Sequence, residues 1–85
     1  MTYTITNKGA KSKMNPERGI IKASGIVAKI SIYKASLDSA FYEAKMVFIC
    51  EDGSKFYEYV GAQRVTQCRK FAEGMFADRV RGYAA

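Results

Sequence analysis

The sequence predicts a two-layer α+β domain: an antiparallel three- to four-stranded β-meander with one C-terminal amphipathic helix packed on one face. Three observations lead to this prediction. Segments rich in β-formers, several of them alternating apolar and polar residues, fill the first two thirds of the chain. An Asp-Gly pair separates two of these segments, and the apolar period then changes to that of a helix.

Residues 1–85 are expected to form a single domain, because the chain is too short for two separate cores. Its 48% hydrophobic and 13% aromatic content is sufficient for one packed core. Disorder of the whole chain is not expected, since enough apolar surface exists to offset the entropy of ordering.

The first segments of the chain predict a strand and then a loop. Residues 2–6, TYTIT, read as a short edge strand. Residues 7–18 lack apolar periodicity and contain Gly9, Asn15 and Pro16, so they are expected to form a basic loop. From Gly19 the chain is β-like again, and Gly25 predicts a bulge or a break in it.

The next two strands are expected at residues 26–33 and 41–50, with a polar turn at residues 35–40 between them. In both segments the even-numbered positions form an apolar row, so they are expected to face the helix. The odd-numbered positions include Lys29, Tyr33, Glu43 and Lys45 and are expected to form the opposite, uncovered face.

Asp52-Gly53 predicts a hairpin that leads into a strand at residues 55–60. A two-residue turn would place Phe48 opposite Tyr57. A type I turn with a bulge at Gly53 would instead place Phe48 opposite Phe56. We prefer the second register, because it buries Phe56 and Val60 and turns Tyr57 and Tyr59 outward, where their hydroxyls need no buried partners. Its cost is Glu58 on the core side.

Residues 62–81 have the apolar spacing of an amphipathic helix, with Gly61 as a permissive start and Gly82 at the expected C-terminal cap. Gly74 falls on the solvent side of this helix, at a cost of about 1 kcal/mol relative to alanine. Arg79 falls on the apolar side, from which it is expected to snorkel outward.

The net charge of +6 is confined to one part of the chain. Residues 1–34 hold seven basic residues and one acid, Glu17, whereas residues 35–85 hold seven of each sign. A positive surface of this kind favours a polyanion or an acidic protein patch as partner, and equally serves solubility alone.

The candidate binding residues come from the basic loop and the uncovered face. Lysines interleaved with tyrosines on a sheet suit single-stranded nucleic acid, because phosphates meet the charges and bases stack on the rings. Cross-strand pairing of good β-formers would produce the same pattern without any function. The candidates are Lys8, Lys11, Lys13, Arg18, Lys22, Lys29, Tyr33, Lys45, Lys55, Tyr57 and Tyr59.

Catalysis is not expected. The chain has no histidine, which removes the usual general base and any histidine-ligated zinc site. It has no phosphate-cradling glycine-rich motif, so no cofactor is expected. Its two cysteines, Cys50 and Cys68, are expected to face the core, and the sequence leaves a bond between them open.

Two functions of different classes follow. The first is a small non-catalytic domain that binds DNA or RNA through the basic loop and the Lys/Tyr face. The second is a protein-binding accessory module, comparable by size and layout only to phage-encoded inhibitors and adaptors, that docks on a larger and nucleic-acid-handling protein. No apolar run approaches the about 20 residues of a membrane span, and no signal peptide is evident, so no membrane partner and a cytoplasmic location are expected. The oligomeric state is left open.

Overall fold

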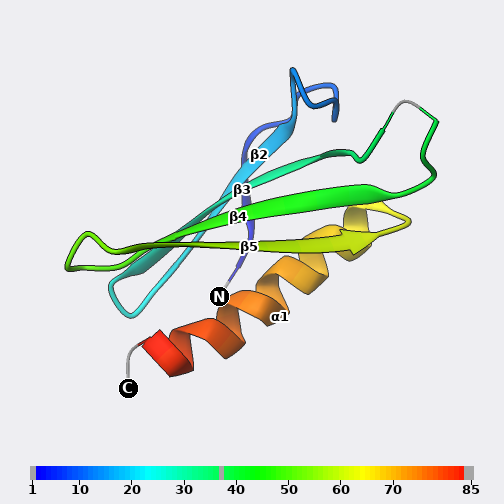
Figure 1. Cartoon of the computed structure of the whole chain (residues 1–85). Coiled ribbons are helices and arrows are strands. Elements are labelled where there is room, and N and C mark those ends of the chain that lie inside the picture. Colours follow the sequence, from blue (N-terminus) through cyan, green and yellow to red (C-terminus); the bar gives the residue numbers. More distant parts are fainter. Residues whose placement is uncertain (1, 37, 84–85) are drawn as a thin grey trace.

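The computed structural model, which describes residues 2–36 and 38–83, contains one antiparallel sheet and one helix (Figure 1). The α+β class is confirmed, but the sheet has five strands instead of three to four. Each strand pairs with the next one along the chain, so the order is β1-β2-β3-β4-β5. The elements are β1 (Thr4–Asn7), β2 (Glu17–Ala23), β3 (Ile26–Lys34), β4 (Tyr42–Ile49), β5 (Lys55–Ala62) and α1 (Val65–Tyr83).

The fifth strand arises because Gly25 marks a hairpin turn rather than a bulge. Ser24 and Gly25 have φ values of 55° and 77°, and Ala23 lies directly opposite Ile26. Positive φ at both central residues is the geometry of a tight two-residue turn, which suits the twist of the flanking strands. Residues 17–23 therefore form a separate strand before β3.

Helix α1 packs across one face of the sheet, which we call the covered face (Figure 1). The even rows of β3 and β4 lie on this face, as their alternation predicts, and Phe48 stacks on Phe76 of the helix with ring centroids 5.9 Å apart. The helix contributes Cys68, Ala72, Phe76 and Val80. The buried apolar side chains of the sheet are Ile21, Ile26, Ala28, Ile30, Ile32, Ala44, Met46, Phe48 and Ala62.

The β4–β5 hairpin adopts the preferred register. Phe48 pairs with Phe56, and Gly53 has a φ of 88° and donates its N–H to the Cys50 carbonyl at 3.0 Å. Glu58 does face the covered side, where its carboxylate accepts a 2.8 Å hydrogen bond from Arg79. Glu58 and Arg79, which the sequence places on the apolar side, thus pair with each other, and Arg79 does not simply extend into solvent.

The expected burial of Phe56 is wrong, because its side chain is 42% exposed. It lies on the edge strand, and its principal cover is the Tyr83 ring, which stacks on it at 4.6 Å. Tyr83 also packs edge-on against Phe48 at 5.6 Å. These contacts explain why the helix continues through Gly82 to Tyr83 instead of ending at a glycine cap.

The other end of the helix and the basic loop also differ from their predicted bounds. The helix begins at Val65 rather than Ala62, because β5 runs on to Ala62, which pairs with Tyr42. The basic loop is limited to residues 8–16, since β2 already begins at Glu17. It is tied to β3 by a 2.9 Å hydrogen bond from the Lys34 N–H to the Lys11 carbonyl.

Candidate nucleic-acid interface

The sheet face turned away from α1, here called the open face, gathers most of the predicted site residues. Residues that are opposite each other on neighbouring strands share a face, so the register assigns each one. Three rows cross this face from β2 to β5: Arg18, Ser31, Lys45 and Tyr59; Ile20, Lys29, Val47 and Tyr57; Lys22, Val27, Ile49 and Lys55. Tyr33 and Glu43 are opposite each other beyond the first row.

The charge on the open face has one dominant sign. Five cations lie on it against a single acid, Glu43. The Glu43 carboxylate accepts a 2.5 Å hydrogen bond from the Tyr33 hydroxyl, so the acid is already engaged within the sheet. Burial, together with this bond to the carboxylate, raises the pKa of Tyr33, and it stays neutral well above neutral pH. The five cations are Arg18, Lys22, Lys29, Lys45 and Lys55.

Two tyrosine rings lie exposed among these cations. Tyr57 and Tyr59 are 58% and 55% exposed, in contrast to Tyr33, which is half-buried. The Lys45 ammonium lies 5.6 Å from the centroid of the Tyr57 ring, within the range of a cation–π contact. Along this part of the face, flat aromatic surfaces and positive charges therefore lie next to each other.

A shallow hollow of about 270 Å³ opens between the first three strands. Arg18 and Lys29 line it together with the hydroxyl-bearing Thr6 and Ser31. Two cations and two hydroxyls supply the donors that an anion such as phosphate requires. A larger hollow, of about 440 Å³, lies beside the turns of the β2–β3 and β4–β5 hairpins. Glu51 and Asp52 line it, and their carboxylates disfavour a polyanion.

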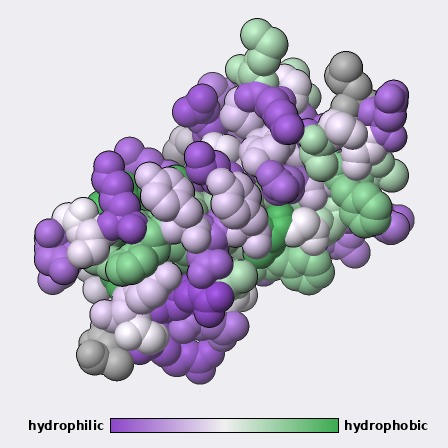
Figure 2. Space-filling view, viewed as in Figure 1, coloured by the Kyte–Doolittle hydropathy of each residue, from purple (hydrophilic) through white to green (hydrophobic). Residues whose placement is uncertain are grey.

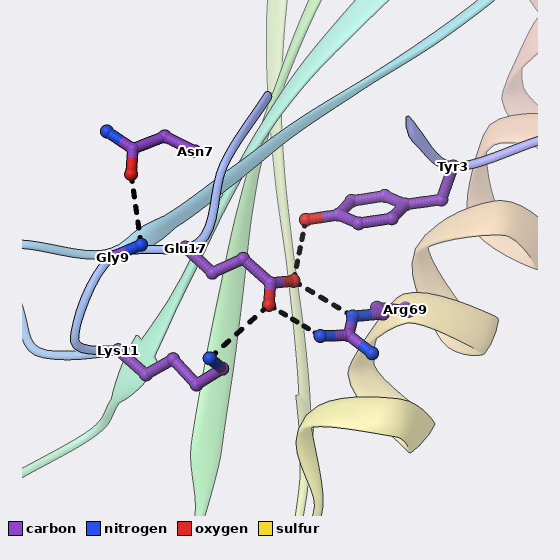
Figure 3. Close-up of polar contacts among 6 residues, drawn as sticks. All are labelled: Tyr3, Asn7, Gly9, Lys11, Glu17 and Arg69. Carbon is purple, nitrogen blue, oxygen red and sulfur yellow. Dashed lines mark hydrogen bonds and ion pairs between the residues drawn. The ribbon is translucent and has the colours of Figure 1, made fainter. Parts of the chain in front are cut away.

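The loop lysines divide into two kinds. Lys8 and Lys13 are exposed on residues 8–16. Lys11 instead extends toward Glu17, with 3.7 Å between its ammonium and the carboxylate (Figure 3). The structure therefore separates Lys11 from the exposed cations with which the sequence grouped it.

Glu17 is the centre of a buried polar cluster between the N-terminal segment, β2 and α1 (Figure 3). Its side chain is fully buried and faces the covered side, opposite Ile32. Arg69 donates to both carboxylate oxygens, at 2.9 and 2.5 Å, and the Tyr3 hydroxyl donates at 2.9 Å. A bidentate arginine is the geometry that best stabilises a buried carboxylate.

The cluster also determines the ionisation of its members. Burial by itself would raise the pKa of Glu17, but the hydrogen bonds from Arg69 and Tyr3 outweigh it and hold the pKa below its ordinary value. Burial and the bond to Glu17 raise the pKa of Tyr3. Glu17 is therefore a carboxylate at neutral pH, and it joins the N-terminal segment and the helix to the sheet.

Sequence reasoning missed this cluster. Tyr3 lies 14 positions before Glu17 in the chain, and Arg69 lies 52 positions after it, so no local spacing links the three residues. A signal was present nevertheless, because Glu17 is the only acid among seven basic residues in the first 34. A lone acid in a basic segment is a candidate for an internal ion pair.

The described residues contain no group of three or more Asp, Glu or Cys side chains placed to hold a metal ion. Both thiols are free: Cys68 is buried in the core and Cys50 is half-buried at the end of β4. Burial raises the pKa of the Cys68 thiol, which makes it less reactive.

Comparison with protein-family models, with curated proteins and with solved structures gives no match for this chain. Within residues 2–36 and 38–83, no helix has the length and apolar character needed to cross a membrane. The surface of the molecule itself is therefore the basis on which a function can be inferred.

Proposed function

We propose that the open face binds single-stranded nucleic acid without catalysis. One observation carries the proposal: five cations and two half-exposed tyrosine rings share a sheet face that contains a single acid. That acid, Glu43, accepts a hydrogen bond from Tyr33, and five cations on the same face outweigh its negative charge.

The cations account for the affinity. Lysine and arginine contacts to phosphates release counterions, and this supplies most of the sequence-independent binding energy. Arg18 and Lys29 flank the hollow between β1, β2 and β3, which we assign as a phosphate subsite. Lys45 and Lys55 continue the positive surface toward β5.

The tyrosines account for the preference for single strands. Bases in a duplex are stacked on each other and cannot lie flat on a protein ring, whereas unpaired bases can. Stacking on an aromatic side chain contributes about 1–3 kcal/mol per base and tolerates any sequence. Tyr57 and Tyr59 have the exposure that stacking requires, whereas Tyr33 is half-buried and hydrogen-bonded to Glu43.

The test is a salt series of fluorescence-anisotropy titrations with a labelled oligothymidylate, the same sequence as RNA, and a duplex of equal length. The Lys29→Gln/Lys45→Gln variant removes two charges from the open face. The matched control, Lys70→Gln/Arg81→Gln, removes two charges from exposed positions on α1. We expect the open-face variant to lose at least about tenfold in affinity, and its salt slope to fall by about 0.7 per lost phosphate contact.

Equal weakening by both variants would mean that binding follows net charge alone, and would contradict the proposal. Preference for the duplex would contradict the assignment to single strands. Tyr57→Thr keeps the β-propensity of the position and removes the ring. Because stacking is not an interaction between charges, the loss of affinity in this variant should persist at high salt. A third double variant, Lys8→Gln/Lys13→Gln, measures how much the basic loop adds to the oligonucleotide affinity of the open face.

The same face supports a second candidate function, a protein-binding accessory module. Tyrosine and arginine are the side chains most often found at the centre of protein interfaces, and Arg18, Tyr57 and Tyr59 are all exposed here. This function predicts a stoichiometric complex with one acidic protein and no salt-dependent binding of oligonucleotides. The anisotropy series above separates the two functions.

A further inference from the structure

We propose that β5 pairs with β5 of a second copy of this chain, so that the two open faces become one continuous surface. The joined surface rests on the proposed function, whereas the pairing does not. The two edge strands of the sheet, β1 and β5, differ sharply in length and regularity.

The edge formed by β1 is poorly suited to further pairing. β1 has four residues, and its register with β2 shifts between Ile5 and Asn7. A short and irregular edge strand is a common protection against edge-to-edge association. β5, by contrast, has eight residues, contains no proline and keeps one register with β4 along its whole length.

The free hydrogen-bonding groups on β5 belong to alternate residues. Cys50 and Ser54 form the hydrogen-bonded pair that closes the hairpin, with 3.0 Å between the Cys50 nitrogen and the Ser54 oxygen. Because hydrogen-bonded pairs alternate along an antiparallel ladder, the even residues of β5 bond to β4. The odd residues, Lys55, Tyr57, Tyr59 and Gly61, direct their N–H and C=O groups away from β4, where no other described backbone group bonds to them.

An apolar strip lies along the same edge. Arg79 bonds to Glu58 of β5, and Phe71 and Met75 lie two turns and one turn before Arg79 on the same side of the helix. Phe71 is 51% exposed, and Phe56, at the start of β5, is 42% exposed. Figure 2 shows that apolar side chains reach the surface between polar ones on this side of the molecule.

A second copy fits this edge better than an unrelated strand does. Antiparallel pairing of β5 with itself is symmetric, so each odd residue meets an odd residue and every free N–H finds a C=O. Although the open face is basic, β5 itself carries one cation, Lys55, at its start, and its acid, Glu58, is paired with Arg79. In an antiparallel pair the two copies of Lys55 lie toward opposite ends of the joined strands. Two copies of a basic protein can therefore approach along β5 without strong repulsion.

The pairing would have a functional consequence. A two-fold axis between the strands keeps both helices on one side of a ten-stranded sheet and both open faces on the other. Tyr57 and Tyr59 of one copy would then lie beside those of its partner, with five cations on either flank. The two copies together would thus form one stacking surface at the centre of a longer positive tract.

Two measurements without nucleic acid test the pairing. Sedimentation equilibrium in 0.5 M NaCl should give twice the mass of the chain. Amide hydrogen exchange followed by NMR should then show slow exchange at Tyr57 and Tyr59, whose N–H groups would face solvent in a monomer. A monomer at high protein concentration, or a dimer in which these two amides exchange rapidly, would overturn the proposal.

Tyr59→Pro removes one outward N–H per chain and no bond to β4, so the fold should survive. We expect its dimer dissociation constant to rise about 100-fold or more, because two hydrogen bonds are lost and their acceptors stay buried. Tyr59→Thr retains the N–H, so its dimer dissociation constant should rise by less than about tenfold. An equal effect of proline and threonine would overturn the backbone pairing.

A second variant leaves the sheet untouched. Phe71→Glu places a charge in the apolar strip and should also give a monomer with an unchanged circular dichroism spectrum. Phe41→Glu is the matched control, since Phe41 is 52% exposed but lies outside β5 and the Phe71 row. Persistence of the dimer in Phe71→Glu would overturn the proposed interface. A stable dimer that fails to bind oligonucleotides would contradict the proposed function alone.

Discussion

The two faces of the sheet are built from adjacent residues of the same strands, yet they differ in burial and in charge. On β4, Met46 and Phe48 are fully buried under the helix, whereas Lys45 and Val47 belong to the open face. The buried and half-buried carboxylates of the covered face are paired, Glu17 with Arg69 and Glu58 with Arg79. The open face instead carries five cations against one acid. The contrast teaches that the buried core of this small domain lies on one face, so the side chains of the other face are not constrained by packing against the helix.

The largest expected effect concerns two neighbouring residues on opposite faces. Phe48→Ala should lower the free energy of unfolding by about 3–5 kcal/mol, because it removes the ring that packs on Phe76 and Tyr83 and leaves a cavity. Val47→Ala, on the open face, should cost no more than about 1.5 kcal/mol. Urea unfolding followed by circular dichroism measures both. Similar losses would show that the open face is as important for stability as the covered face.

The next effect concerns the charges of the covered face. Arg69→Met should destabilise the protein by about 3 kcal/mol, since it leaves the buried Glu17 carboxylate without its bidentate partner. Arg81→Met, which breaks only the exposed pair with Asp78, should leave the urea midpoint unchanged. If both variants have the same midpoint, the buried cluster is not a stabilising element.

The same cluster predicts a pH dependence. The pKa of Glu17 is lower in the folded protein than its ordinary value of 4.5, so folding favours the carboxylate. The stability that results is fully present above pH 4.5 and is lost as the pH falls through the lower, folded-state pKa. Urea midpoints between pH 7 and pH 3 should therefore fall more steeply in the wild type than in Glu17→Gln or Arg69→Met. Parallel slopes in all three proteins would contradict this assignment.

The smallest effect compares two solvent-facing glycines. A Cβ at Gly74 would meet no atom within 4 Å, so Gly74→Ala should stabilise the helix by up to about 1 kcal/mol. Gly53 is equally open, but its φ of 88° is unfavourable for alanine, so Gly53→Ala should destabilise the hairpin. Thermal unfolding compares the two, and shifts of the same sign would contradict the distinction.

Much of the architecture was determined by the sequence alone, because the relevant forces act locally. Alternation assigned the buried rows of β3 and β4, the Asp52-Gly53 turn favoured the observed register of β5, and the change of period predicted α1. The open-face positions of Lys29, Lys45, Tyr57 and Tyr59 follow from the same alternation. Only the role of these residues is still a proposal.

Other features were decided only by the tertiary structure, because they depend on contacts between distant parts of the chain. Glu17 and Arg69 meet across 52 positions, and this pairing draws Lys11 away from the exposed cations. Tyr83 extends the helix beyond Gly82 because it packs on Phe48 and Phe56, and β5 becomes an edge because no later strand follows it within the described residues. Local propensity cannot predict such contacts, since their energy exists only once the layers have assembled.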